Sequence, residues 1–209
     1  NHLKNKVVSF KDKAINIQYN SKSLNVCLES AVHSKTEKVI LAIGARPKKL
    51  KFRGLQEISF ETAVNPKALQ MAVGESDVVA VFGSYQSART IAENMGKTKA
   101  QKIVHFYRSE RSFKAHVASI GLKKSTDAIP ITPENLLKFL PQCNKVIYAV
   151  GFERRALPIQ YLAEDYHYDE NTGQIAPGIF GLGIAFPEII AHSHGREKYK
   201  VNAIYPILK

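Results

Sequence analysis

Apolar and polar residues alternate over short stretches at the start of the chain, and this alternation predicts β-strands. The predicted strands cover residues 7–10, 14–19 and 24–29, with polar turns between them. We expect these strands to form a small antiparallel meander. The next apolar run, residues 37–44, is continuous, which is typical of a strand buried on both faces, and Pro47 ends it.

The middle of the chain changes to strands that alternate with amphipathic helices. A strand at 77–82 runs into Gly83, and a second strand at 102–107 completes a βαβ unit of about thirty residues. A right-handed crossover makes these two strands parallel. His105 lies in the middle of the second strand, so we expect it in the core. The helix between the strands has apolar residues at i, i+3, i+4 and i+7, namely Ala88, Ile91, Ala92 and Met95.

Weaker patterns predict the remaining elements. Asn65 can cap a helix that Gly74 ends, and further short helices are predicted at 113–120 and 132–140. A loop is expected over residues 121–131. The remaining predicted strands cover residues 145–151, 161–168 and 178–185.

The turn after the strand at 77–82 carries part of a dinucleotide-binding pattern. The Rossmann fingerprint G-x-G-x-x-G/A aligns with Gly83, Tyr85 and Ala88, so a tyrosine stands where backbone normally approaches a pyrophosphate. Backbone N–H groups and the helix dipole favour an anion here. The alternative is a turn that needs glycine for steric reasons only, with the tyrosine ring either swung aside or filling the phosphate space. The predicted cofactor-binding residues are Gly83, Ser84, Tyr85, Gln86 and Ser87.

Basic residues follow the second strand of the unit. NAD-specific proteins carry Asp or Glu here to accept a bond from a ribose hydroxyl, whereas this chain has Arg108 and Ser109, with Arg111 close behind. A guanidinium pairs bidentately with a phosphate, so these residues favour NADPH over NADH. Glu110 is an alternative ribose partner. A solvated basic loop without a ligand is the alternative interpretation of the whole segment.

Four glycine-containing segments stand in an order that resembles a known family. LAIGARP, VFGSYQSA, YAVGFERR and PGIFGLGIA contain Gly44, Gly83, Gly151 and Gly183. They look like the A-T-G-x-x-P strand, the second Rossmann fingerprint, the second A-T-G-F segment and the late Gly-Asp segment of one superfamily. This is the pyridine nucleotide-disulfide oxidoreductase superfamily of flavoproteins with two dinucleotide-binding domains. The resemblance covers about residues 14–187.

The resemblance implies an α/β fold in which residues 54–150 form a Rossmann-like, parallel-sheet domain for the nicotinamide nucleotide. Residues 1–53, which hold the small β-meander, and 151–209 would be remnants of a FAD-domain fold that come together in space. The implied function is a flavoprotein oxidoreductase, reductase- or monooxygenase-like, that passes hydride from NADPH to FAD. Gly44 and Gly151, at the two crossings between domains, would lie beside the cofactors.

The chain departs from the family pattern at the flavin. No G-x-G-x-x-G precedes residue 83, so we expect a fragment whose FAD pyrophosphate motif lies in a missing N-terminal portion. Ile184 stands where the family's aspartate contacts the flavin ribityl chain, and Ile43 and Val150 replace threonines. FAD binding by this chain alone is therefore not expected, and no catalytic acid or base is identified. The alternative function is a catalytically degenerate Rossmann-fold module for binding or scaffolding.

Composition and charge narrow the range of partners. The net charge is +12, yet the basic residues are scattered and no nucleic-acid motif is present, so nucleic acid is not an expected partner. No apolar run is long enough for a membrane span. Cys27 and Cys143 form no C-x-x-C pair, which fits a reducing cytoplasm. His192 and His194 lack neighbouring ligands, so no metal site is expected. The substrate and the oligomeric state stay open.

Overall fold

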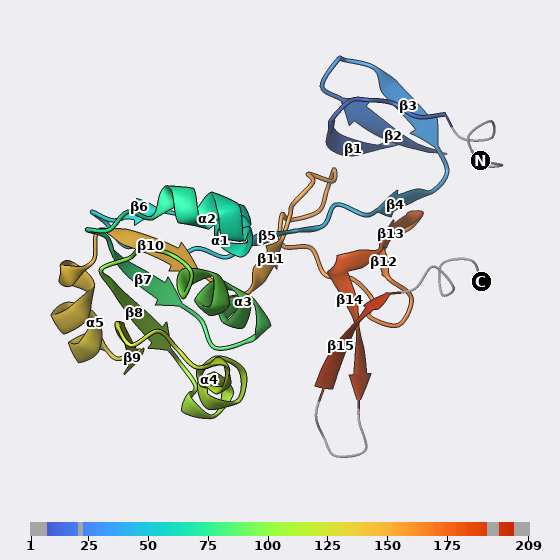
Figure 1. Ribbon diagram of the computed structural model, residues 1–209. Helices are drawn as coiled ribbons and strands as arrows, with labels where there is room; N and C mark the ends of the chain where they lie inside the picture. Colours follow the sequence, from blue (N-terminus) through green and yellow to red (C-terminus); the bar gives the residue numbers. More distant parts are fainter. Residues whose placement is uncertain (1–7, 21–22, 192–196, 203–209) are drawn as a thin grey trace. The chain divides into compact units, whose positions relative to one another are not determined.

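The computed structural model describes residues 8–20, 23–191 and 197–202, and Figure 1 shows its elements. The described chain divides into two compact units. One consists of the residues up to Arg46 together with those from Arg154 onward, and the other runs from Pro47 to Glu153. The first unit is built of strands and the second of strands and helices, so the mixed α/β class predicted from the sequence is confirmed.

The second unit is built on a sheet of five parallel strands in the order β6-β10-β7-β8-β9. The two central strands pair from Val78 opposite Lys102 to Phe82 opposite Phe106, which confirms the predicted parallel βαβ unit. The strands are β6 (Gln56–Glu57), β7 (Val78–Phe82), β8 (Lys102–Tyr107), β9 (Thr126–Pro130) and β10 (Lys145–Tyr148).

Local sequence signals start most of the helices of this unit. Ser59, Asn65, Ser109 and Thr132 each cap one helix, because their side-chain oxygens accept a hydrogen bond from an N–H of the first turn. The predicted cap at Asn65 is thereby confirmed. The helices are α1 (Phe60–Val64), α2 (Pro66–Ala72), α3 (Gln86–Met95), α4 (Glu110–His116) and α5 (Pro133–Phe139), with 3-10 turns at Ala118–Ile120 and Leu140–Gln142.

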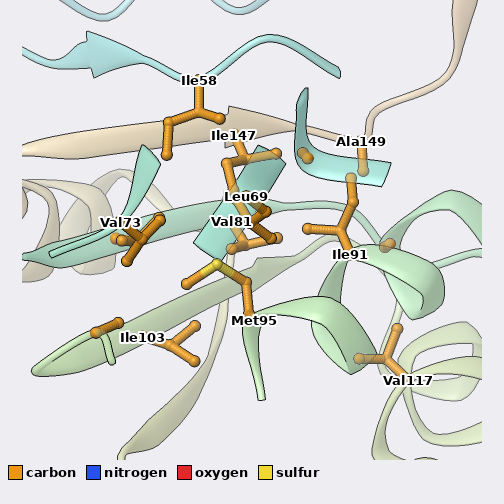
Figure 2. Close-up of a cluster of buried hydrophobic side chains, with 14 of the residues drawn as sticks. Ile58, Leu69, Val73, Val81, Ile91, Met95, Ile103, Val117, Ile147 and Ala149 are labelled. Carbon is orange, nitrogen blue, oxygen red and sulfur yellow. The ribbon is translucent and has the colours of Figure 1, made fainter. Parts of the chain in front are cut away.

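Apolar clusters cover both faces of the five-stranded sheet. On one face α1 to α4 pack against the strands, and Ile91 and Met95 of α3 lie fully buried in this cluster (Figure 2). On the other face, beside α5, Phe82 stacks on Phe52 and on Phe106 with ring centroids 5.1 and 4.7 Å apart. Successive side chains along each strand point to opposite faces, so the same strands contribute to both apolar clusters.

The first unit consists of small sheets around one apolar cluster that includes Ile17, Leu41 and Phe186. Strands β1 to β3 form an antiparallel meander, and β4 pairs in parallel with β13, which pairs antiparallel with β12. Strands β14 and β15 form a hairpin. A separate two-stranded sheet pairs β5 with β11, the two segments in which the chain passes from one unit to the other. Their bounds are β1 (Ala14–Asn20), β2 (Ser23–Leu28), β3 (His33–Thr36), β4 (Val39–Leu41), β5 (Ala45–Pro47), β11 (Phe152–Arg154), β12 (Gln174–Ala176), β13 (Ile179–Gly181), β14 (Gly183–Ala191) and β15 (Glu197–Asn202).

The meander differs from the prediction in its membership. Val7 lies outside the described residues, residues 8–10 form no strand, and Val8 and Phe10 are exposed. The third strand is instead β3, whose sequence HSKT has no apolar pattern. It forms by pairing with β2, and as an edge strand it buries little surface of its own. The prediction of a first strand at 7–10 was therefore wrong.

Two predicted apolar strands are shorter than expected. Within residues 37–44 only β4 is a strand, and it has one neighbour, β13, in the described sheet. Ile40 is consequently 48% exposed, so the prediction of a strand buried on both faces was wrong. The run 178–185 divides into β13 and β14 at Gly183, whose φ of +86° turns the backbone out of the extended region.

Three other predictions were wrong for local reasons. Residues 121–131 are not all loop, because β9 forms at the sheet edge with half-buried and exposed positions that give no apolar pattern. Residues 161–168 contain turns instead of a strand, and Tyr161 has a left-handed φ of +66°. The helix expected from residue 113 begins earlier, at Glu110, because Ser109 caps it.

Candidate functional site

The carboxyl edge of the five-stranded sheet contains a reversal in strand order. From β7 the chain passes to β8 and β9 on one side and then returns to β10 on the other (Figure 1). Ligands of open parallel sheets bind outside the carboxyl ends of the strands at such a switch point. Gly83 follows β7 directly at this edge, so the topology puts the predicted dinucleotide turn where a ligand is expected.

Space restricts position 83 to glycine. Gly83 has a φ of +150°, and a Cβ there would lie 2.5 Å from the carbonyl oxygen of Ala149 and 2.9 Å from the Cβ of Ala88. Its N–H donates to the carbonyl oxygen of Phe106 at 3.0 Å. The close approach of Ala149, after β10, and Ala88 of α3 therefore explains this glycine without a ligand. The donors for an anion at this turn must then come from the backbone N–H groups at the start of α3.

Helix α3 starts without a side-chain cap. Tyr85 occupies its N-cap position and makes no capping hydrogen bond, whereas the other four α-helices of the described chain have Ser, Asn or Thr caps. The N–H groups of the first turn of α3 are left for an acceptor outside the helix, and an anion suits both these donors and the helix dipole. Around this turn Ser84 is buried, Ser87 is half-buried and Gln86 is exposed.

The ring of Tyr85 is turned toward α4. Its centroid lies 5.5 Å from that of His116, the last residue of α4, and Tyr85 is 60% exposed. The ring therefore rests beside the neighbouring helix and is not buried in the Gly83 turn. Of the two arrangements that the sequence allows, the structure has the ring swung aside.

The basic segment lies beside this turn because β8 pairs with β7 and both strands end at the same edge. Arg108 and Arg111 are exposed there. The hydroxyl of Ser109 accepts a hydrogen bond from the N–H of Ser112 at 3.3 Å, so this hydroxyl serves as a helix cap. Two exposed arginines thus follow the strand that neighbours β7, at the edge of the sheet where α3 begins.

Glu110 has a partner on its own helix. Its carboxylate lies 2.6 Å from the Nζ of Lys114, and the hydrogen bond and charge of that ammonium group lower the pKa of Glu110. This ion pair competes with any bond from Glu110 to a ribose hydroxyl. Sequence reasoning missed Lys114 as a third cation of the segment, although its i, i+4 spacing from Glu110 was the available signal.

His105 also belongs to this site, and the sequence indicated only that it lies in the core. It is fully buried, and its Nε2 lies 3.0 Å from the carbonyl oxygen of Gly83. Burial lowers the pKa of His105 to about 4, against the effect of this hydrogen bond. The imidazole is therefore neutral at physiological pH.

The two other predicted glycines belong to different units. Gly44 (φ +67°) lies in the first unit, where its carbonyl oxygen accepts a hydrogen bond from the N–H of Arg155 at 3.3 Å. Gly151 (φ +96°) follows β10 in the second unit and accepts from the N–H of Lys48 at 2.9 Å. Both φ values favour glycine for conformational reasons, and a cofactor role for either residue stays a prediction.

Comparisons with known proteins place this geometry in context. No known protein-family profile matches the chain. Monooxygenase AgnR1 of Paecilomyces divaricatus is 31% identical over 72 residues, which are 30% of this chain and 18% of that protein. Thioredoxin reductase of Lactococcus lactis matches with a TM-score of 0.56 at 14% identity, over 83% of this chain and 65% of its own.

Two further solved structures agree with this match. Tmm of Pelagibacter sp. has a TM-score of 0.60 at 16% identity, over 88% of this chain and 46% of its own. A flavin-containing monooxygenase of Stenotrophomonas maltophilia has a TM-score of 0.55 at 14% identity, over 84% of this chain and 63% of its own. The chain has the two-dinucleotide-binding flavoprotein fold. It spans less than two thirds of the length of each of these relatives.

Ile184 does not suit the flavin contact that the resemblance predicts for its position. Ile184 is 58% exposed at the start of β14, and its side chain offers no hydrogen-bond donor or acceptor at the position predicted to lie beside the ribityl chain. His192 and His194 lie outside the described residues. The described residues contain no group of three His, Cys, Asp or Glu side chains that could hold a metal, and none of their helices is long and apolar enough to cross a membrane.

Proposed function

We propose that this chain carries the nicotinamide-nucleotide site of a flavin-dependent oxidoreductase, reductase- or monooxygenase-like, and that NADPH is its reductant. One observation carries this proposal: the uncapped start of α3 lies at the switch point of the sheet, beside the exposed Arg108 and Arg111. The flavoprotein fold of the chain supports the same class of activity.

The roles of the residues follow from their positions. The backbone N–H groups at the start of α3, with the hydroxyls of Ser84 and Ser87, would bind the pyrophosphate. Arg108 and Arg111 would bind the 2′-phosphate, since guanidinium groups hold phosphate in a bidentate manner. NADPH supplies a hydride when bound, and these residues bind and orient it.

FAD would be held by a polypeptide portion that this sequence does not include. The reason is the misfit at Ile184, which leaves no polar side chain where the ribityl chain is expected. No step of the reaction is therefore assigned to residues of this chain beyond binding of the nucleotide. The proposed setting is the reducing cytoplasm, and Cys27 and Cys143 are both free thiols.

A binding or scaffolding module is the second candidate function. The observation that favours it is the steric explanation of Gly83, whose missing side chain makes room for Ala149 and needs no ligand. Tyr85 at the second fingerprint position agrees with it.

Thermal unfolding with and without nucleotide tests the two functions against each other. A ligand that binds only the folded protein raises its stability by about 2.7 kcal/mol at a hundredfold excess over Kd. We expect NADPH to raise the unfolding temperature of the full chain, and NADH to raise it less at the same concentration. An unfolding temperature that neither nucleotide changes would contradict the oxidoreductase proposal and favour the module.

A further inference from the structure

His105 is a polar residue in a position built for an apolar one. It lies on the face of β8 that packs against α3 and α4, and it has no exposed surface. Ile103 and Tyr107 share this face by strand alternation and contribute to the apolar cluster there. Burial of an imidazole in such a cluster costs free energy unless a hydrogen bond compensates for it. The burial of His105 therefore requires a hydrogen-bond partner inside the protein.

A hydrogen bond to the Gly83 turn compensates for this burial and determines which imidazole nitrogen carries the proton. A carbonyl oxygen can only accept, so the Nε2 that lies 3.0 Å from the oxygen of Gly83 must carry the proton. Nδ1 is then a bare acceptor, and it has no hydrogen-bond partner in the described chain. The ring meets Phe113 of α4 edge to face, with centroids 5.0 Å apart, which holds the imidazole in place.

The direction of this hydrogen bond determines the orientation of the next peptide group. In a trans peptide the C=O and the following N–H point in opposite directions, and the described chain contains no cis peptide. The carbonyl of Gly83 points at the buried imidazole, so the N–H of Ser84 points away from it. If this peptide turned over, a carbonyl oxygen would replace an N–H at the start of the anion site.

We propose that His105 is a positioning residue for the dinucleotide: by holding the Gly83 carbonyl it keeps the Gly83–Ser84 peptide oriented with its N–H toward the bound pyrophosphate. This inference rests on the proposed function, because it assigns a role within the same site. It adds a residue that lies beneath the turn and touches no cofactor. The N–H of Gly83 donates to the carbonyl oxygen of Phe106. The hydrogen bond from the imidazole therefore fixes the remaining polar group of Gly83, its carbonyl.

Two variants of similar length separate the hydrogen bond from the packing. His105→Gln keeps an N–H donor at nearly the same reach, and His105→Met removes the donor. We expect His105→Met to weaken NADPH and NADH binding by the same factor, about tenfold, as measured by calorimetric titration of the full chain. We expect His105→Gln to restore most of the affinity. Adenosine 2′-monophosphate, which has no pyrophosphate, is expected to bind the wild type and both variants equally.

The results that would contradict the role of His105 differ from the result that would contradict the proposed function. Unchanged NADPH affinity in His105→Met, equal weakness of His105→Gln, or equal weakening of adenosine 2′-monophosphate would overturn the role of His105 while leaving the proposed function intact. A wild type that binds neither dinucleotide would overturn the proposed function and this role with it.

A measurement on the unaltered protein does not depend on the folding of the variants. We expect the imidazole nitrogen NMR signals of His105 to show the neutral tautomer with the proton on Nε2 at neutral pH, with and without NADPH. A proton on Nδ1 would overturn the proposal directly, because the carbonyl of Gly83 would then have no donor.

Discussion

Single residues of the Gly83 turn are governed by different physical requirements. Gly83 is fixed by the space that Ala149 leaves, whereas the extended φ of −120° at Tyr85 suits any residue. A tyrosine at the second fingerprint position therefore causes no backbone strain and only adds bulk beside the anion site. The sequence could predict that the turn needs glycine at position 83, because the fingerprint reserves that position for a residue without a side chain. It could not predict the direction of the Tyr85 ring, which depends on contact with His116 of another helix.

Replacement of Arg108 tests the assignment of the 2′-phosphate. Arg108→Ala is expected to weaken NADPH binding by about 2 kcal/mol, the usual contribution of a charge-assisted hydrogen bond, and to leave NADH binding unchanged. Lys67→Ala is the matched control, because it removes one positive charge from an exposed site on α2. Calorimetric titration with both nucleotides measures the difference. Equal losses for NADPH and NADH would contradict the assignment.

Replacement of Tyr85 tests whether its bulk hinders the pyrophosphate. Because the ring rests beside α4 and does not fill the Gly83 turn, Tyr85→Gly is expected to change NADPH affinity by less than about threefold. Tyr85→Phe removes only the hydroxyl and is expected to bind like the wild type. A glycine variant that binds NADPH about tenfold more tightly than the phenylalanine variant in fluorescence titration would show that the ring restricts the site.

The low pKa of His105 predicts a dependence of stability on pH. Above about pH 6.5 the imidazole is neutral in both the folded and the unfolded chain and contributes no pH dependence. Below this pH the unfolded chain binds a proton that the folded chain does not, so the free energy of unfolding falls until about pH 4. The loss from this residue is about 3 kcal/mol. Denaturant unfolding of wild type and His105→Gln over this range measures it, and identical slopes would contradict the account.

The sequence predicted the secondary-structure elements that bury an apolar face. It predicted poorly those that bury little side-chain surface. The central strands β7 and β8 were found because both of their faces are covered, so β7 is apolar throughout and β8 is apolar apart from Lys102 and His105. Strands β3 and β9 lie at sheet edges, where backbone pairing and not side-chain burial defines them. Helix α4 was placed too late because its start depends on the side-chain cap from Ser109, which has no apolar signal. The same limit applied to the site, since the contact of His105 with Gly83 depends on tertiary packing.

Helix α3 depends on its buried stripe. Ile91 is fully buried between the helix and the sheet (Figure 2), so Ile91→Ala is expected to lower the free energy of unfolding by about 2–5 kcal/mol. Met71 on α2 is 87% exposed, and Met71→Ala is expected to change it by less than about 0.5 kcal/mol. Chemical denaturation measures both. Similar losses for the two variants would contradict the packing described for α3.

At the scale of the whole molecule, each unit contains its own apolar cluster. The cluster that includes Ile17 and Phe186 belongs to the first unit, and the two clusters on the faces of the parallel sheet belong to the second. The anion site, Arg108 and His105 all belong to the second unit. The proposed nucleotide site and Ile184 therefore belong to different units.

Expression of residues 47–153 alone tests this independence. Because the five-stranded sheet has both of its faces covered within this range, we expect the fragment to unfold cooperatively and to bind NADPH with an affinity within about threefold of the full chain. Circular dichroism during heating and calorimetric titration provide the two readouts. A fragment without a cooperative transition would show that the second unit needs the first.

The most direct test of the central claim is calorimetric titration of the full chain with NADPH and, in parallel, with NADH. We expect both to bind at the Gly83 turn and NADPH to bind more tightly by about tenfold or more, since Arg108 and Arg111 would add contacts to its 2′-phosphate. Absence of binding by either nucleotide, or equal affinity for both, would contradict a live NADPH site.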